Sequence, residues 1–234
     1  TRREIDTTKW DHCIDTAGNG LIYAYSFYLD HMARNWDALV FNDYEAVMPL
    51  TWNRKFGIRY LYQPFLTAQL GVFGKKITEE QVGLFAQNIP SSFRLIEISL
   101  NSGNIQAIPT GFPIHRSNYV LDLNRPYGEL NKNYNENIQR NIKKSIQAGS
   151  GVQKDFDVEK VIGLAVQQMK SQSGESTDNV NRFRKLYQYL HQKQMATTYG
   201  IVSGKGEMLA SCVFFFSHNR AYYILVGNHP NSRN

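Results

Sequence analysis

The chain has 234 residues, a formal net charge of +6, and an apolar content of 42% with 13% aromatic residues. This composition supplies enough apolar surface for a packed core, so it indicates a globular protein and excludes an intrinsically disordered one. No apolar run approaches the roughly 20 residues that a membrane-spanning helix needs. The modest charge is compatible with an anionic small molecule, a nucleotide-linked substrate, tRNA or a membrane surface, and it selects none of them.

The two cysteines, Cys13 and Cys212, are too few for a disulfide framework, so we expect a reducing, cytoplasmic setting. Cys212 lies in the apolar run SCVFFF, where a free thiol is more often a small buried hydrophobe than a nucleophile. The N-terminal sequence TRREIDTTKWDHC has basic residues with no apolar segment behind them, which argues against a signal peptide. The first residue is not Met, so upstream residues can be missing.

Residues 1–125 predict a first mixed α/β unit. Its expected elements are helices over 7–17 and 24–33, strands over 37–42, 44–53 and 57–63, an irregular loop over 64–76, a helix over 79–89, and strands over 93–100, 105–109 and 118–124. Pro49 implies a sheet edge or a bulge, because proline cannot donate to a ladder. Thr78 and Gln81 form a capping-box pattern at the start of the third helix.

Residues 126–150 predict a basic connecting helix. Tyr134, Ile138, Ile142 and Ile146 recur at spacings of four and form a narrow apolar stripe that we expect to be packed. A different, contiguous face of this helix is polar and basic, and it carries Arg140, Lys143, Lys144 and Gln147. We expect this face to bind an anion, and the alternative is a plain solvated face, which is equally common.

Residues 151–234 predict the start of a second unit, with a strand over 152–156, two helices capped by Asp157 and Asp178, and a three-strand meander over 198–225. This meander repeats the pattern of residues 38–63, although such meanders also occur without a repeat in α+β proteins. The repeat predicts two separate sheets. The sequence closes on GNHPNSRN, directly after a strand whose far edge would be open, so we expect the second unit to be incomplete.

Common catalytic signatures are absent from the sequence. It contains no G-x-x-x-x-G-K-[ST] and no G-x-S-x-G, and no G-x-G-x-x-G follows a predicted strand. The six histidines show no metal-ligand spacing, so we expect no metal site. His218 and His229 flank the last strand, and each is predicted to be a surface residue.

Two stretches carry a resemblance to a known family. The first is EAVMPLTW through RYLYQPFLTAQLGVFG (45–74), and the second is NYVLDLN followed by NENIQRNIKKSIQAGSGVQKDFDVEKV (118–161). They resemble the GNAT acyltransferase superfamily and, more narrowly, are similar to the Fem-type peptidoglycan-bridge aminoacyltransferases. The resemblance implies tandem GNAT-like domains with mixed, mostly antiparallel sheets flanked by helices. It also implies transfer of an amino acid from aminoacyl-tRNA to the peptide of a lipid- or nucleotide-linked muropeptide.

The chain departs from the wider superfamily at the carrier site. The signature [RQ]-x-x-G-x-[GA], which binds the pyrophosphate of CoA in that superfamily, is absent. The corresponding loop, GVFGKKIT, has Lys75 and Lys76 beside a helix start, where an anion can bind. The resemblance therefore leaves acyl-CoA and aminoacyl-tRNA open as the co-substrate, and it implies no firm cofactor.

Polar residues at strand ends are the candidates for binding an acceptor. They are Tyr62, Gln63, Thr67, Gln69, Arg116 and Tyr119. The structural alternative is that these groups bond neighbouring backbone, as polar groups at strand ends usually do. No acidic residue or histidine is placed as a general base, but acyl transfer to an amine needs mainly positioning and a polarised carbonyl.

These observations give two functional hypotheses. The first is an N-acyl or aminoacyl transferase that acts on a small-molecule or peptide-linked amine in cell-wall peptide metabolism. The second is a non-catalytic binding module, derived from a transferase, that recognises a muropeptide or another anionic ligand.

Overall fold

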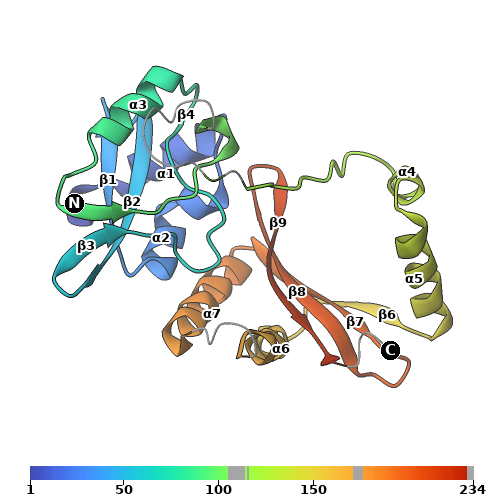
Figure 1. The fold of residues 1–234 in the computed structure, drawn as a ribbon. Helices are drawn as coiled ribbons and strands as arrows, with labels where there is room; N and C mark the ends of the chain where they lie inside the picture. The colour runs from blue at the N-terminus through green and yellow to red at the C-terminus, as the bar shows by residue number, and fades with distance from the viewer. Residues whose placement is uncertain (105–113, 115, 171–175, 231–234) are drawn as a thin grey trace.

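The computed structural model describes residues 1–104, 114, 116–170 and 176–230, and it contains two separate sheets (Figure 1). The first follows a helical N-terminal segment made of η1 (Arg2–Glu4), α1 (Thr7–Thr16), η2 (Ile22–Ala24) and α2 (Ser26–Met32). The helix predicted over 24–33 is present as α2, but it begins at Ser26 because Tyr25 is extended between η2 and α2.

The first sheet has the strand order β1-β2-β3-β5, with β4 also paired to β2. Its strands are β1 (Asn35–Phe41), β2 (Ala46–Lys55), β3 (Ile58–Leu61), β4 (Phe73–Gly74) and β5 (Phe93–Ile96). All pairings are antiparallel except β3 with β5. At Pro49, β2 pairs only with β1, because β4 pairs at residues 46–47 and β3 at 52–55, so the predicted open edge is confirmed.

Helix α3 (Glu79–Gln87) and the N-terminal helices pack against the first sheet through different sets of residues. Val82 and Phe85 of α3 pack with Met48 and Leu50, whereas Trp10 of α1 belongs to a second, larger cluster. The capping box predicted for α3 is confirmed, since Thr78 Oγ1 accepts from Gln81 N at 3.2 Å and Gln81 Oε1 accepts from Thr78 N at 3.1 Å.

The second sheet is antiparallel, in the order β6-β7-β8-β9. Its strands are β6 (Gly151–Lys154), β7 (Ala196–Val202), β8 (Met208–Ser217) and β9 (Arg220–Asn228), and helices α6 (Val158–Lys170) and α7 (Thr177–Gln192) pack against it. The prediction of a mixed α/β fold with two sheets flanked by helices is therefore confirmed. The boundaries 1–125, 126–150 and 151–234 stay predictions.

One apolar core joins the two sheets. The larger cluster contains Trp10 and Tyr28 from the N-terminal helices together with Phe183 of α7 and Phe215 of β8. His218, in the turn after β8, contributes to the same contact, since its Nε2 lies 2.9 Å from the carbonyl oxygen of Ile14. His218 is half-buried there, which corrects the prediction that it lies free on the surface.

A buried asparagine cluster holds the loop that precedes β4. Asn19, Asn101 and Asn104 each donate from Nδ2 to the carbonyl oxygen of Val72, at 2.8, 3.2 and 3.1 Å. Asn104 Oδ1 also accepts from the backbone N–H of Val72 at 2.8 Å. The sequence predicted residues 101–103 only as a turn. In the structure Asn101 precedes η3 (Ser102–Asn104), which includes the rest of this segment.

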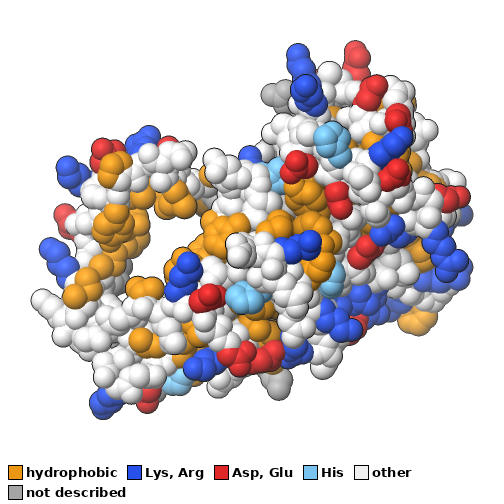
Figure 2. Space-filling view, turned by 180° about the vertical axis from the view of Figure 1, so that it is seen from behind, with side chains coloured by type: hydrophobic (Ala, Val, Ile, Leu, Met, Phe, Trp, Pro, Cys, Tyr) orange, Lys and Arg blue, Asp and Glu red, His pale blue; other side chains and the backbone are white. Residues whose placement is uncertain are grey.

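Two sequence predictions for the middle of the chain are wrong. Residues 118–124 form no strand, and Tyr119 and Val120 are 92% and 83% exposed. The stripe of α5 (Glu136–Gln147), which follows α4 (Tyr127–Lys132), is not packed, since α5 has no buried residue and Ile146 is 67% exposed. In Figure 2 apolar side chains line the inner side of this arm, across an opening from the rest of the protein. The strand predicted at 105–109 lies outside the described residues.

Candidate functional site

Tyr62 follows β3 at the junction between the two sheets. Its backbone continues the ladder, with Tyr62 N donating to the carbonyl oxygen of Thr51 at 3.0 Å and Thr51 Oγ1 donating to the carbonyl oxygen of Tyr62 at 2.5 Å. Its hydroxyl accepts the backbone N–H of Arg34 at 2.9 Å. Burial raises the pKa of Tyr62, and Arg34 and Arg182 oppose this effect only in part, so the hydroxyl stays protonated.

Helix α7 brings a second arginine to this junction. Arg182 Nη1 donates to the carbonyl oxygens of His31 and Ala33, at 3.3 and 3.2 Å, and so binds the C-terminal end of α2. Its Nε donates to Asp178 Oδ2 at 3.0 Å. The same carboxylate lies 3.7 Å from Arg34 Nη2, which ties the segment between α2 and β1 to α7.

One carboxylate therefore faces two guanidinium groups. The hydrogen bond from Arg182, with the charges of Arg182 and Arg34, keeps the pKa of Asp178 below its ordinary value, so this carboxylate is ionised. The side chains of Arg34 and Asp178 are 48% and 51% exposed, so solvent and solutes reach the cluster. Guanidinium groups bind carboxylates and phosphates with paired hydrogen bonds, so this cluster has the chemistry of an anion site.

Arg34 and Arg182 were not among the site residues predicted from the sequence. Asp178 was predicted as the N-cap of α7, whereas the structure places Ser176 there, with its side chain accepting from Asn179 N at 3.3 Å. The available signal was the spacing of Asp178 and Arg182, four residues apart on one helix, which places both side chains on the same face.

Three polar residues predicted to bind the acceptor lie in the loop that follows Tyr62. Gln63 bridges this loop, with Nε2 donating to the carbonyl oxygen of Thr67 at 2.7 Å and Oε1 accepting from Ser99 N at 3.0 Å. Thr67 is buried, and its Oγ1 lies 3.4 Å from the carbonyl oxygen of Phe65. Gln69 is half-exposed. Gln63 and Thr67 thus have structural partners, while their role toward an acceptor stays a prediction.

The structure does not gather the other predicted residues at this junction. Arg116 and Tyr119 lie on the exposed segment that leads to α4, and Figure 1 places α4 and α5 on the side of the molecule away from β3. The cations predicted to bind anions are all exposed. They are Lys75, Lys76, Arg140, Lys143 and Lys144. Beside the two lysines that precede α3, Glu79 and Glu80 occupy its first turn and oppose an anion there.

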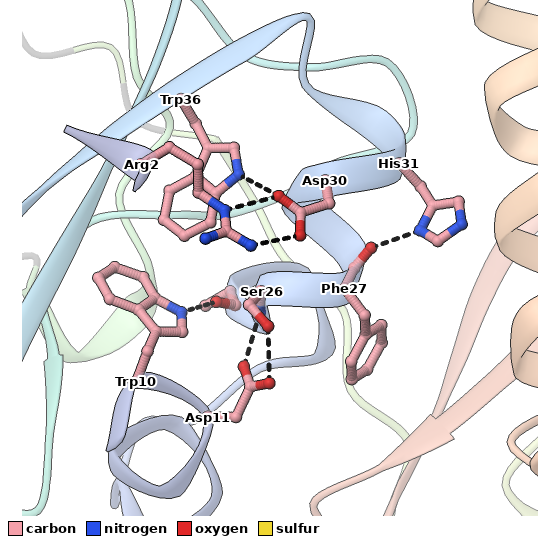
Figure 3. Close-up of polar contacts among 9 residues, drawn as sticks. Arg2, Trp10, Asp11, Ser26, Phe27, Asp30, His31 and Trp36 are labelled. Carbon is pink, nitrogen blue, oxygen red and sulfur yellow. Dashed lines mark hydrogen bonds and ion pairs between the residues drawn. The ribbon is translucent and has the colours of Figure 1, made fainter. Parts of the chain in front are cut away.

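A polar cluster on the N-terminal helices fixes the position of α2 (Figure 3). Asp30 accepts from Arg2 Nε and Nη2, at 2.8 and 2.7 Å, and from Trp36 Nε1 at 2.8 Å. Asp11 accepts from Ser26 N and Oγ, both at 2.7 Å. Burial raises the pKa of Asp11, whereas for Asp30 the hydrogen bonds from Arg2 and Trp36 outweigh burial and lower the pKa. These contacts hold the helix that delivers Arg34 to the junction.

The cysteines do not provide a nucleophile. Cys13 is buried, and burial raises the pKa of its thiol to about 11. Cys212 is half-buried, and burial raises the pKa of that thiol too. Among the described residues no cluster of His, Cys, Asp or Glu is arranged to hold a metal ion. No helix in the same part of the chain has the length and apolar character to cross a membrane.

Comparison with known proteins identifies the fold. No family model matches the sequence, and no curated protein matches it. Among solved structures the chain is similar to FemX, with a TM-score of 0.66 at 11% sequence identity, over 98% of this chain and 81% of FemX. A likeness at this identity shows that the chain has a fold like that of FemX.

Proposed function

We propose that the protein is an N-acyl or aminoacyl transferase that moves an acyl group from an activated carrier to an amine, in cell-wall peptide metabolism. The observation that carries the proposal is the cluster of Arg34, Arg182 and Tyr62, at the junction of two sheets in a fold similar to FemX. The acceptor is a nucleotide- or lipid-linked muropeptide whose phosphate or carboxylate groups bind the two arginines. The site of action is the cytoplasm.

The chemistry asks little of side chains beyond positioning. The amine of the acceptor attacks the carbonyl carbon of the activated acyl group, the bond to the carrier breaks, and the amine loses one proton. Holding the two reactants in the correct geometry supplies a large part of such a rate enhancement. The arginines fix the anionic part of the acceptor, and the hydroxyl of Tyr62 donates to the same group.

The carrier is either an aminoacyl-tRNA or an acyl-CoA. For either carrier, we assign its phosphates to the exposed cations Lys75, Lys76, Arg140, Lys143 and Lys144. Binding through these residues would weaken as salt rises, because exposed charges are screened.

A second candidate function is a non-catalytic binding module for a muropeptide. It needs only the arginine cluster, because Gln63 and Thr67 already have hydrogen-bond partners within the protein. In that case the arginine cluster binds the ligand and no transfer follows.

Calorimetric titration with a nucleotide-linked muropeptide tests the shared part of both proposals. We expect Arg34→Ala and Arg182→Ala each to weaken binding by about tenfold, a value typical of a lost charge-assisted contact. Arg125→Ala is the matched control, because Arg125 also pairs with a carboxylate, Asp122 at 3.6 Å, on an exposed segment. Equal affinity in all variants would refute the site, and binding without amide formation when a carrier is added would select the binding module.

A further inference from the structure

The turn after Tyr62 is held in an unfavourable backbone conformation. Leu66 has a φ of 55°, in the left-handed region that residues other than Gly, Asn and Asp rarely adopt. Hydrogen bonds from several elements maintain it. Tyr28 Oη donates to the carbonyl oxygen of Leu66 at 2.6 Å, Thr67 N donates to that of Pro64 at 3.1 Å, and Gln63 Nε2 closes the loop on Thr67. Strain of this kind persists only where surrounding contacts fix it, and it is often found at functional sites.

Phe65, within this turn, lines an apolar pocket whose other lining residues belong to the second unit. The other residues that line the pocket are Ile162, Ala165, Val166 and Met169 of α6, Val180 and Phe183 of α7, and Leu225 of β9. Among the described residues, Phe65 is the single lining residue from the first unit, and all of those that line the pocket are apolar. Ile162, Ala165, Phe183 and Leu225 are buried, so the floor of this pocket is fixed.

The same two segments carry the arginine cluster. Phe65 lies three residues after Tyr62, and Val180 of the pocket lies between Asp178 and Arg182 on α7. A displacement of Phe65 along α7 would therefore change the distance between Tyr62 and Arg182. Packed contacts transmit such displacements because close-packed interiors have low compressibility.

We propose that Phe65 is a positioning residue that sets the spacing between the Tyr62–Arg34 side and the Arg182 side of the anion site. Its ring seats the first unit on α6 and α7, and the strained turn keeps the ring at one angle. The effect of Phe65 on ligand binding rests on the proposed function. Its packing against α6 and α7 does not.

Two measurements test this role separately. The first is the affinity for inorganic pyrophosphate, by calorimetry. The second is the distance distribution between spin labels at Gln87 on α3 and Gln188 on α7, which are both exposed, in a Cys212→Ser background. In Phe65→Ala we expect a broader distance distribution and about tenfold weaker pyrophosphate binding, a typical coupling between sites. Phe65→Leu keeps an apolar side chain in the pocket, so it should retain most of both properties.

The control is Phe56→Ala, since Phe56 is 92% exposed and outside the pocket. It should change neither measurement. If Phe65→Ala does not fold, Leu66→Gly replaces it. Glycine frees the backbone of the turn while the Phe65 side chain is retained, so this variant should broaden the distance distribution and weaken pyrophosphate binding.

An unchanged distance distribution in the folded variant overturns the positioning role. A broader distribution with unchanged pyrophosphate affinity overturns the link to the site and leaves Phe65 as a packing residue. If the wild type binds no pyrophosphate, the anion site of the proposed function fails, and the distance measurement still decides whether Phe65 seats the two units.

Discussion

Removal of the Arg182 guanidinium should loosen the contact between α2 and α7. Arg182→Ala deletes two hydrogen bonds to the carbonyl oxygens of His31 and Ala33 and one ion pair with Asp178. The two distances, 3.3 and 3.2 Å, are long, so we take about 1 kcal/mol for each hydrogen bond and a few tenths for the half-exposed pair. The expected loss in the free energy of unfolding is about 2 kcal/mol, which corresponds to a melting temperature lower by roughly 4–8 °C.

Urea denaturation and scanning calorimetry measure this loss. Arg182→Lys keeps the charge but cannot reach two carbonyl groups with a planar fork, so we expect an intermediate loss. Lys185→Ala is the matched control, because Lys185 is an exposed cation on the same helix, and it should change the free energy by less than about 0.5 kcal/mol. A loss in Arg182→Ala as small as that of the control would refute the reasoning that Arg182 holds α2 to α7.

Three further predictions concern other parts of the chain. Asn104→Ala leaves the buried N–H of Val72 without its acceptor, and we expect a loss of about 2 kcal/mol in urea denaturation; a loss within experimental error would contradict it. The lowered pKa of Asp30 means that its stabilisation is fully present above its ordinary pKa and is lost as pH falls through the lowered value, so stability should decline below about pH 4, and Asp30→Asn should show a shallower decline. The buried Cys13, with a pKa of about 11, should react with a thiol reagent far more slowly than Cys212 at pH 8, and equal rates would argue against its burial.

Local patterns in the sequence predicted local structure well. The meander pattern of residues 38–63 and 198–225 predicted two sheets, and two sheets are present. Thr78 and Gln81 predicted the start of α3, because a capping box involves only residues three apart. Asp157 likewise accepts from Glu159 N at 3.0 Å at the start of α6, as expected.

Contacts between distant parts of the chain could not be predicted from the same patterns. The stripe of α5 has helical spacing, but periodicity states that one face is apolar and not what covers it, so Ile146 was wrongly expected to be packed. Arg182 binds carbonyl groups about 150 residues earlier in the chain, and no local signal reports such a pairing. The role of Asn104 was missed for the same reason, since its partner Val72 lies 32 residues away.

The core that joins the N-terminal helices to α7 and β8 bears on how the protein unfolds. Trp10 and Tyr28 pack with residues of both sheets, so neither half can lose its interior without exposing that of the other. A single cooperative transition is the expected behaviour of such a shared interior. By contrast, residues 116–126 are exposed, and exposed segments are preferred cleavage sites for proteases. The shared core therefore holds the two sheets together, while the exposed segment 116–126 connects them only through the backbone. A chain cleaved between Arg116 and Pro126 would remain one folded particle.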